Sequence, residues 1–125
     1  MRSSIIKHLK RRAKMAIDNI KIIDGMGINK DKDAIMLLLC DHLPWEGEKA
    51  PKVVDHLLLL QKKLNMYISF LESGQYKEKY PTLEPKMAFI DIRFQYEIPE
   101  TCQQFLQTVQ DEVGELGIKI EVHIG

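Results

Sequence analysis

The sequence predicts an α+β fold: a four-stranded mixed or antiparallel sheet with two long helices on one face and an extra N-terminal basic amphipathic helix. Two stretches, 51–74 and 99–117, repeat apolar residues every three or four positions, which is the period of a helix with one buried face. Two others, 87–96 and 118–124, alternate apolar and polar residues as half-buried strands do. At 125 residues the chain is long enough for one domain with its own core.

Residues 1–19 are expected to form the N-terminal helix, and residues 20–125 a single α+β domain. Within residues 1–14, six side chains are cationic and none is acidic. If this helix contacts an anion or a nucleic acid, five residues are the candidates: Lys7, Lys10, Arg11, Arg12 and Lys14. The alternative is a solvated basic face whose apolar side packs on the body of the protein.

A hairpin is expected between the N-terminal helix and the first long helix. Residues 20–23 form a short apolar run that indicates a strand, and Gly25, Gly27 and Asn29 follow it as turn residues. Residues 34–40 are apolar at both alternating sets of positions, which predicts a central strand. Because the connection is short, the two strands should be antiparallel.

The helix at 51–74 is the predicted organiser of the core. Pro51 stands at its entrance, where the missing N–H costs nothing, and Gly74 follows it as a left-handed cap. A second flank of this helix is also largely apolar, and it is formed by Leu59, Lys63, Met66 and Phe70. Since one layer of sheet cannot cover both sides of a helix, this flank is a candidate interface, covered by the N-terminal helix or by a partner.

The most suggestive polar groups are two Asp-His pairs, Asp41-His42 and Asp55-His56. A neutral imidazole binds a metal or accepts a proton, and a nearby carboxylate fixes its tautomer. A ligand or metal site in this region would use four residues: Asp41, His42, Trp45 and His56. The structural alternative is that Asp41 or His42 holds the loop by backbone hydrogen bonds, while Trp45 and His56 close the core.

Composition and motifs narrow the classes of function. The chain has 18 basic and 18 acidic residues, so its net charge indicates no partner. We find no phosphate-binding glycine loop, serine nucleophile motif or metal-ligand spacing, and therefore predict no cofactor, metal or catalytic residue. Cys40 and Cys102 fit buried free thiols in a reducing cytoplasm. No apolar run approaches the ~18–20 residues of a membrane span, so no membrane partner is expected.

Three stretches of the middle of the chain carry a resemblance: Asp41-His42-Leu43-x-Trp45, then His56, and Leu60-Gln61-x-Lys63-Leu64-Asn65-x-Tyr67. With these residues the chain resembles an uncharacterised bacterial family of small stand-alone α/β proteins, catalogued as a domain of unknown function. The resemblance implies a bacterial cytosolic protein. It adds Asn65 and Tyr67 to the positions of interest and implies no activity.

These observations support three hypotheses. The first is a non-enzymatic module that associates with itself, as a dimer, or with another protein, through the second flank of the 51–74 helix and the opposite charges of the two chain ends. The second is a small metal-binding protein or enzyme that uses Asp41, His42 and His56. The third is nucleic-acid binding through the basic N-terminal helix.

Overall fold

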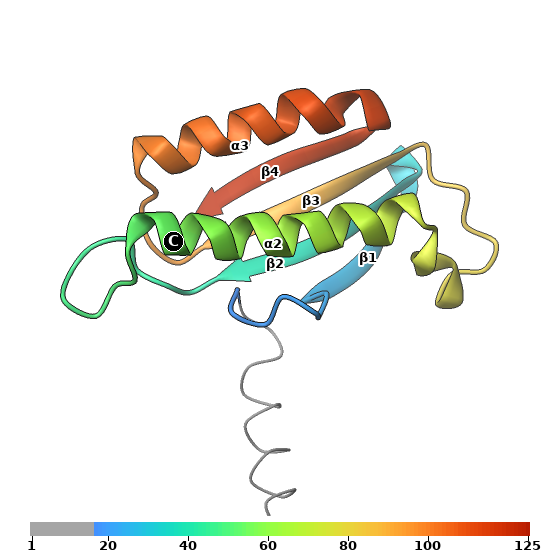
Figure 1. Cartoon of the computed structure of the whole chain (residues 1–125). Helices are drawn as coiled ribbons and strands as arrows, with labels where there is room; N and C mark the ends of the chain where they lie inside the picture. Colours follow the sequence, from blue (N-terminus) through green and yellow to red (C-terminus); the bar gives the residue numbers. More distant parts are fainter. Residues whose placement is uncertain (1–16) are drawn as a thin grey trace, which may run out of the picture.

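A computed structural model describes residues 17–125 of the chain. Its strands are β1 (Gly25–Asn29), β2 (Ala34–Asp41), β3 (Met87–Phe94) and β4 (Ile118–Ile124). They lie in the order β1-β2-β3-β4, with β1 antiparallel to β2 and the other neighbours parallel (Figure 1). The predicted four-stranded sheet is confirmed in its mixed form.

Two helices connect the parallel strands. Helix α2 (Val53–Glu72) joins β2 to β3, and helix α3 (Glu100–Val113) joins β3 to β4 (Figure 1). Parallel neighbours need such long crossovers, and successive crossovers in the same direction place their helices on one face of the sheet. Gly74 follows α2 with a φ of 75°, the predicted left-handed conformation. Three short 3-10 turns complete the described elements: Lys30–Lys32, Gln75–Glu78 and Gly114–Leu116.

The core lies between the sheet and the two helices. Alternate residues of β2 and β3 supply fully buried side chains, namely Ile35, Leu37, Leu39, Ile90 and Ile92. They belong to one cluster with the apolar stripes of the helices, which are Leu60, Leu64 and Tyr67 of α2 and Cys102, Leu106 and Val113 of α3. Burying one large aliphatic side chain stabilises the fold by about 1.5–3 kcal/mol, so this layer fixes the helices on the sheet.

The first strand differs from the sequence prediction. Residues 20–23 are not a strand; β1 begins at Gly25 and includes the glycines that were expected to form a turn. Gly25 pairs with Leu38, and a Cβ on it would lie 3.3 Å from the Leu38 side chain. Glycine is therefore used here for close packing of two strands. The antiparallel hairpin itself is confirmed, and its turn ends at Asp33, which has a φ of 51°.

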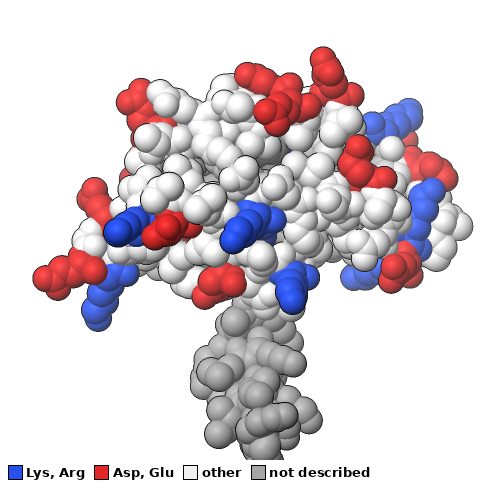
Figure 2. Space-filling view, viewed as in Figure 1, with Lys and Arg blue, Asp and Glu red and all other residues white. Residues whose placement is uncertain are grey.

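The face of the sheet away from the core carries neither α2 nor α3. Strand register arranges its side chains in three rows, Met36-Phe89-Lys119, Leu38-Asp91-Glu121 and Cys40-Arg93-His123. We call these nine residues, together with Gly25 and Gly27, the open face. On the side seen in Figure 2, acidic and basic side chains are interspersed over the described part of the molecule. No large patch of a single sign marks a binding surface in that view.

The basic N-terminal helix falls mostly outside the described residues, and so do Lys7, Lys10, Arg11, Arg12 and Lys14. The first described residue, Ile17, is fully buried in the core cluster. Neither helix within residues 17–125 is long and apolar enough to cross a membrane.

Candidate functional site

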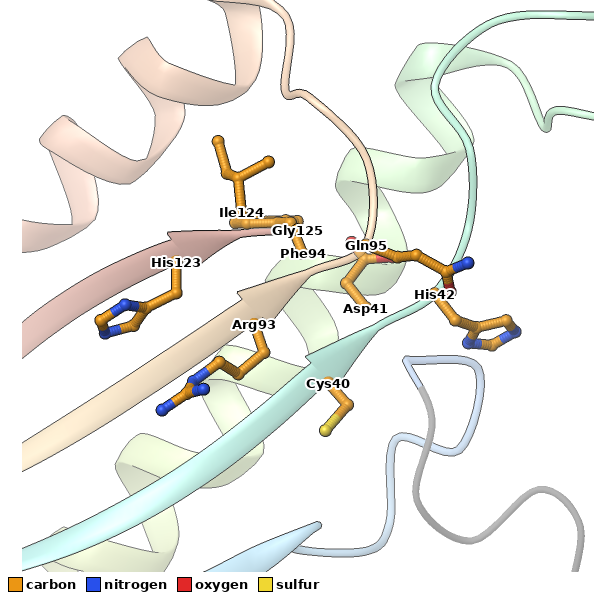
Figure 3. Close-up of a pocket in the computed structure, with 9 residues that line it drawn as sticks. All are labelled: Cys40, Asp41, His42, Arg93, Phe94, Gln95, His123, Ile124 and Gly125. Atoms are coloured by element: carbon orange, nitrogen blue, oxygen red, sulfur yellow. The ribbon is translucent and has the colours of Figure 1, made fainter.

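A hollow of about 390 Å³ lies where the three parallel strands end (Figure 3). Its lining comes from the last residues of β2, β3 and β4 and the residues that follow them: Cys40, Asp41, His42, Arg93, Phe94, Gln95, His123, Ile124 and Gly125. The carboxyl ends of parallel strands are the usual place for ligands in sheets with helical crossovers. We call this hollow the strand-end cavity.

Three neighbouring strands place Cys40, Arg93 and His123 in one row at the cavity. In Figure 3 their side chains extend from the same side of the sheet. Asp91 lies two residues before Arg93 on the same face of the sheet. Its Oδ2 accepts a hydrogen bond from Nε of Arg93 at 3.0 Å and lies 3.0 Å from Nη2 of Arg93. The bond to the carboxylate raises the pKa of the Arg93 guanidinium, which therefore stays charged.

The second oxygen of Asp91 faces His123. Nε2 of His123 lies 3.3 Å from Asp91 Oδ1, which is ion-pair distance, but the alignment is too poor for a hydrogen bond. The Asp91 side chain is 12% exposed, whereas the Arg93 and His123 side chains are 57% and 54% exposed. A nearly buried carboxylate thus positions two exposed nitrogen-bearing side chains.

Cys40 is half-buried beside this group. Burial and, next in size, the carboxylate of Asp24 raise the pKa of its thiol. A thiol with a raised pKa is mostly protonated at neutral pH and is a poor nucleophile. The cavity therefore offers charge and hydrogen-bond donors rather than a reactive sulfur.

Beneath the cavity, on the helix side of the sheet, three of the predicted site residues come together: Asp41, Trp45 and His56. Oδ2 of Asp41 lies 2.7 Å from Nε2 of His56, and the Trp45 and His56 rings stack with centroids 3.5 Å apart. This contact is a hydrogen bond in the tautomer of His56 that carries its proton on Nε2, because an ionised carboxylate can only accept. Oδ1 of Asp41 also accepts from the backbone N–H of Leu43 at 3.1 Å. His42 is separate from this group; it is exposed and lines the cavity.

Asp41 and His56 are inaccessible to a solute, because they are 1% and 0% exposed. Their contacts tie the loop after β2 to the start of α2. The described residues contain no group of three or more His, Cys, Asp or Glu side chains that could hold a metal ion.

A second buried polar cluster was not predicted from the sequence. Nζ of Lys63 lies 2.7 Å from Oδ1 of Asp24, and Oδ2 of Asp24 accepts from the backbone N–H of Cys40 at 2.8 Å. The Tyr67 hydroxyl accepts from the backbone N–H of Asp24 and donates to the carbonyl of Leu38. Burial raises the pKa of this hydroxyl. The sequence signals were a lysine on a largely apolar helix flank and the family resemblance, whose motif contains Lys63 and Tyr67.

This cluster also bears on the flank that was predicted to be an interface. Lys63 is fully buried, and it also donates to the backbone carbonyl of Asn19 at 3.0 Å, so residues 19–24 reach this side of α2. The other three members of the flank, Leu59, Met66 and Phe70, are half-buried and pack against the core cluster. Lys63 is therefore not available to a partner, and the flank is less open than the sequence suggested.

A known protein family matches most of the chain. Residues 15–125 match a family described as a family of unknown function, DUF6572. The chain belongs to this family. The membership agrees with the resemblance found in the sequence, and it assigns no activity to the residues around the strand-end cavity. No curated protein and no solved structure matches the chain.

Proposed function

We propose that this member of DUF6572 is a self-associating binding module, and that a second copy covers its open face. The observation that carries the proposal is the pair of apolar side chains Met36 and Leu38 on the face of the sheet away from the helices. Parallel strands are usually covered on both faces, and here residues 17–125 cover only one. A shallow hollow of about 280 Å³ lies beside these side chains, over Gly25 and Gly27.

The edges of the sheet are less suited to association than its face. β4 is an edge strand, but the side-chain amide of Gln110 donates to the carbonyl of Ile118 at 3.1 Å and accepts from the N–H of Ile120 at 2.7 Å. These bonds occupy backbone groups that an added strand would need, which is a recognised way to protect a sheet edge. The other edge, β1, has only five residues.

The charges of the open face favour a second copy as the partner. Lys119 and Glu121 are both on β4, in the rows that contain Met36 and Leu38. Consider a second copy rotated by 180° about an axis that runs across the strands, between those two rows. Lys119 of one copy then faces Glu121 of the other, and Met36 of one copy faces Leu38 of the other. The face is thus complementary to itself along β2 and β4, while Phe89 and Asp91 of β3, both buried within their own copy, also face one another.

The size of the open face predicts how strong this association is. Four strands about 4.8 Å apart and seven residues long, at about 3.3 Å per residue, give roughly 440 Å² for each copy. Two such faces bury roughly 900 Å², which is less than the ~1,200–2,000 Å² of stable complexes. A dimer with a dissociation constant in the micromolar range is expected.

Sedimentation equilibrium of the full chain at micromolar to near-millimolar concentration tests the proposal. The unmodified chain should pass from monomer to dimer, and Met36→Lys should remain monomeric because it buries a charge in the interface. Val54→Lys is the matched control: Val54 is 60% exposed on α2, away from the open face, so this variant should associate normally. Melting temperatures of both variants establish that they fold.

Three results contradict the proposal. One is a full chain that stays monomeric over the whole range. Another is equal weakening by Met36→Lys and Val54→Lys. A chain that dimerises only after residues 1–16 are removed also contradicts it, because that segment would then occupy the face in place of a second copy.

A further inference from the structure

We propose that the strand-end cavity binds a small ligand through a carboxylate or phosphate group, with the Arg93 guanidinium as the main contact and His123 beside it. This site goes beyond self-association. It uses the last row of the open face and the residues that follow the strands, whereas the proposed association centres on Met36 and Leu38. The two sites adjoin, because Arg93 also lines the hollow beside those side chains.

The geometry of Arg93 carries the proposal. Asp91 Oδ2 contacts Nε and Nη2 of Arg93, so it takes up one edge of the guanidinium. The other edge, with Nη1, has no hydrogen-bond acceptor among residues 17–125. A guanidinium binds oxyanions through two parallel N–H groups, and here its orientation is already fixed. More than half of the side chain remains exposed at the rim of the cavity.

The other polar groups of the cavity favour an anion over a cation. Nε2 of His123 faces Asp91, and the imidazoles of His123 and His42 and the amide of Gln95 can all donate hydrogen bonds. Among the described residues, the lining has one side-chain carboxylate, Asp41, which is buried and bonded to His56 and to the N–H of Leu43. Asp41 is paired with His56 and Asp91 with Arg93, so neither side-chain carboxylate is left to hold a cation.

The volume and the net charge set the class of ligand. About 390 Å³ accommodates a metabolite-sized molecule rather than a polymer. Because Asp91 balances the charge of Arg93, affinity depends on hydrogen-bond geometry more than on net charge, and millimolar dissociation constants are expected for the smallest ligands. Figure 3 shows His42 and Gln95 on the far side of the group from His123, so a larger ligand could contact both ends.

Histidine imidazole resonances in NMR spectra provide the test, with inorganic phosphate and succinate titrated separately at constant ionic strength. The His123 signal should shift and saturate with at least one of the two, and the buried His56 signal should not move. Saturation with phosphate alone identifies a phosphate site, and saturation with succinate alone a carboxylate site. Shifts that only drift linearly with both overturn the proposal.

Two charge-removing substitutions make the test specific to Arg93. Arg93→Gln should weaken binding at least tenfold. Lys62→Gln removes an exposed cation of α2 that does not line the cavity, and should leave affinity within twofold. Equal affinities in these two variants overturn the assignment. Repeating the titration with Met36→Lys separates this site from self-association, because a monomeric variant should still bind the anion.

Discussion

Two ion pairs show how differently the two faces of the sheet use the same chemistry. Asp24 and Lys63, 2.7 Å apart on the helix side, are both fully buried as side chains. Asp91 and Arg93, 3.0 Å apart on the open face, have side chains that are 12% and 57% exposed. Buried charges must be matched by partners inside the protein, whereas a half-exposed guanidinium keeps N–H groups for a ligand.

Asp24 and Asp91 also differ in the groups that they bind. Asp24 gives one oxygen to Lys63 and the other to the N–H of Cys40, so it joins the segment before β1 to α2 and β2. Within residues 17–125, Asp91 pairs with Arg93 and His123, both of which line the strand-end cavity. The first arrangement stabilises the fold, and the second orients exposed groups.

The largest expected effect comes from removing Lys63, the cation of the buried pair. Lys63→Met leaves a buried Asp24 carboxylate without its counter-charge and should lower the free energy of unfolding by about 3–5 kcal/mol. Arg93→Met, the matched change on the open face, should cost much less, because water solvates the carboxylate that remains. Urea denaturation of both variants measures the difference. Equal losses in the free energy of unfolding of the two variants would contradict the distinction between the two faces.

A smaller loss of folding stability is expected at alkaline pH, and it distinguishes Cys102 from Cys40. Burial raises the pKa of the Cys102 thiol to about 12 from an ordinary value of 9.0. Between these values the unfolded chain has released a proton that the folded chain keeps. The free energy of unfolding should therefore be undiminished below pH 9 and fall as pH rises, by about 1.4 kcal/mol per unit for this group.

Urea denaturation at pH 8 and pH 11 measures this loss of stability. Cys102→Ala should reduce the pH dependence without abolishing it, because the raised pKa of Tyr67 also costs stability above pH 10. Cys40→Ala, on the open face, should change it less. If both variants keep the slope of the unmodified chain, burial of Cys102 is not its cause.

The helices and the later strands were predictable from the sequence because their periods are regular. The apolar stripe of α2 and the alternation in β3 and β4 are local patterns, and the elements form where those patterns occur. The prediction for residues 20–23 was wrong for a non-local reason. β1 is defined by its pairing with β2, where Gly25 gives Leu38 room, and an isolated glycine otherwise resembles a turn signal.

The candidate site was only partly visible in the sequence. Asp41 and His56 drew attention as members of Asp-His pairs, and they do meet, but in the closed interior. Asp91, Arg93 and His123 lie on two strands separated by a whole helix, and only parallel register brings them together. Alternation placed them on the polar sides of their strands. It did not show that these sides adjoin.

Reversal of the Lys119 and Glu121 charges tests the central claim, that the open face receives a second copy, most directly. Lys119→Glu and Glu121→Lys should each weaken dimerisation, because each sets like charges against one another across the two-fold axis. The double variant restores opposite charges and should return the dissociation constant close to that of the unmodified chain in sedimentation equilibrium. Two results would contradict the claim. One is a double variant whose loss of dimerisation free energy equals the sum of the losses in the single variants. The other is normal association of all three variants.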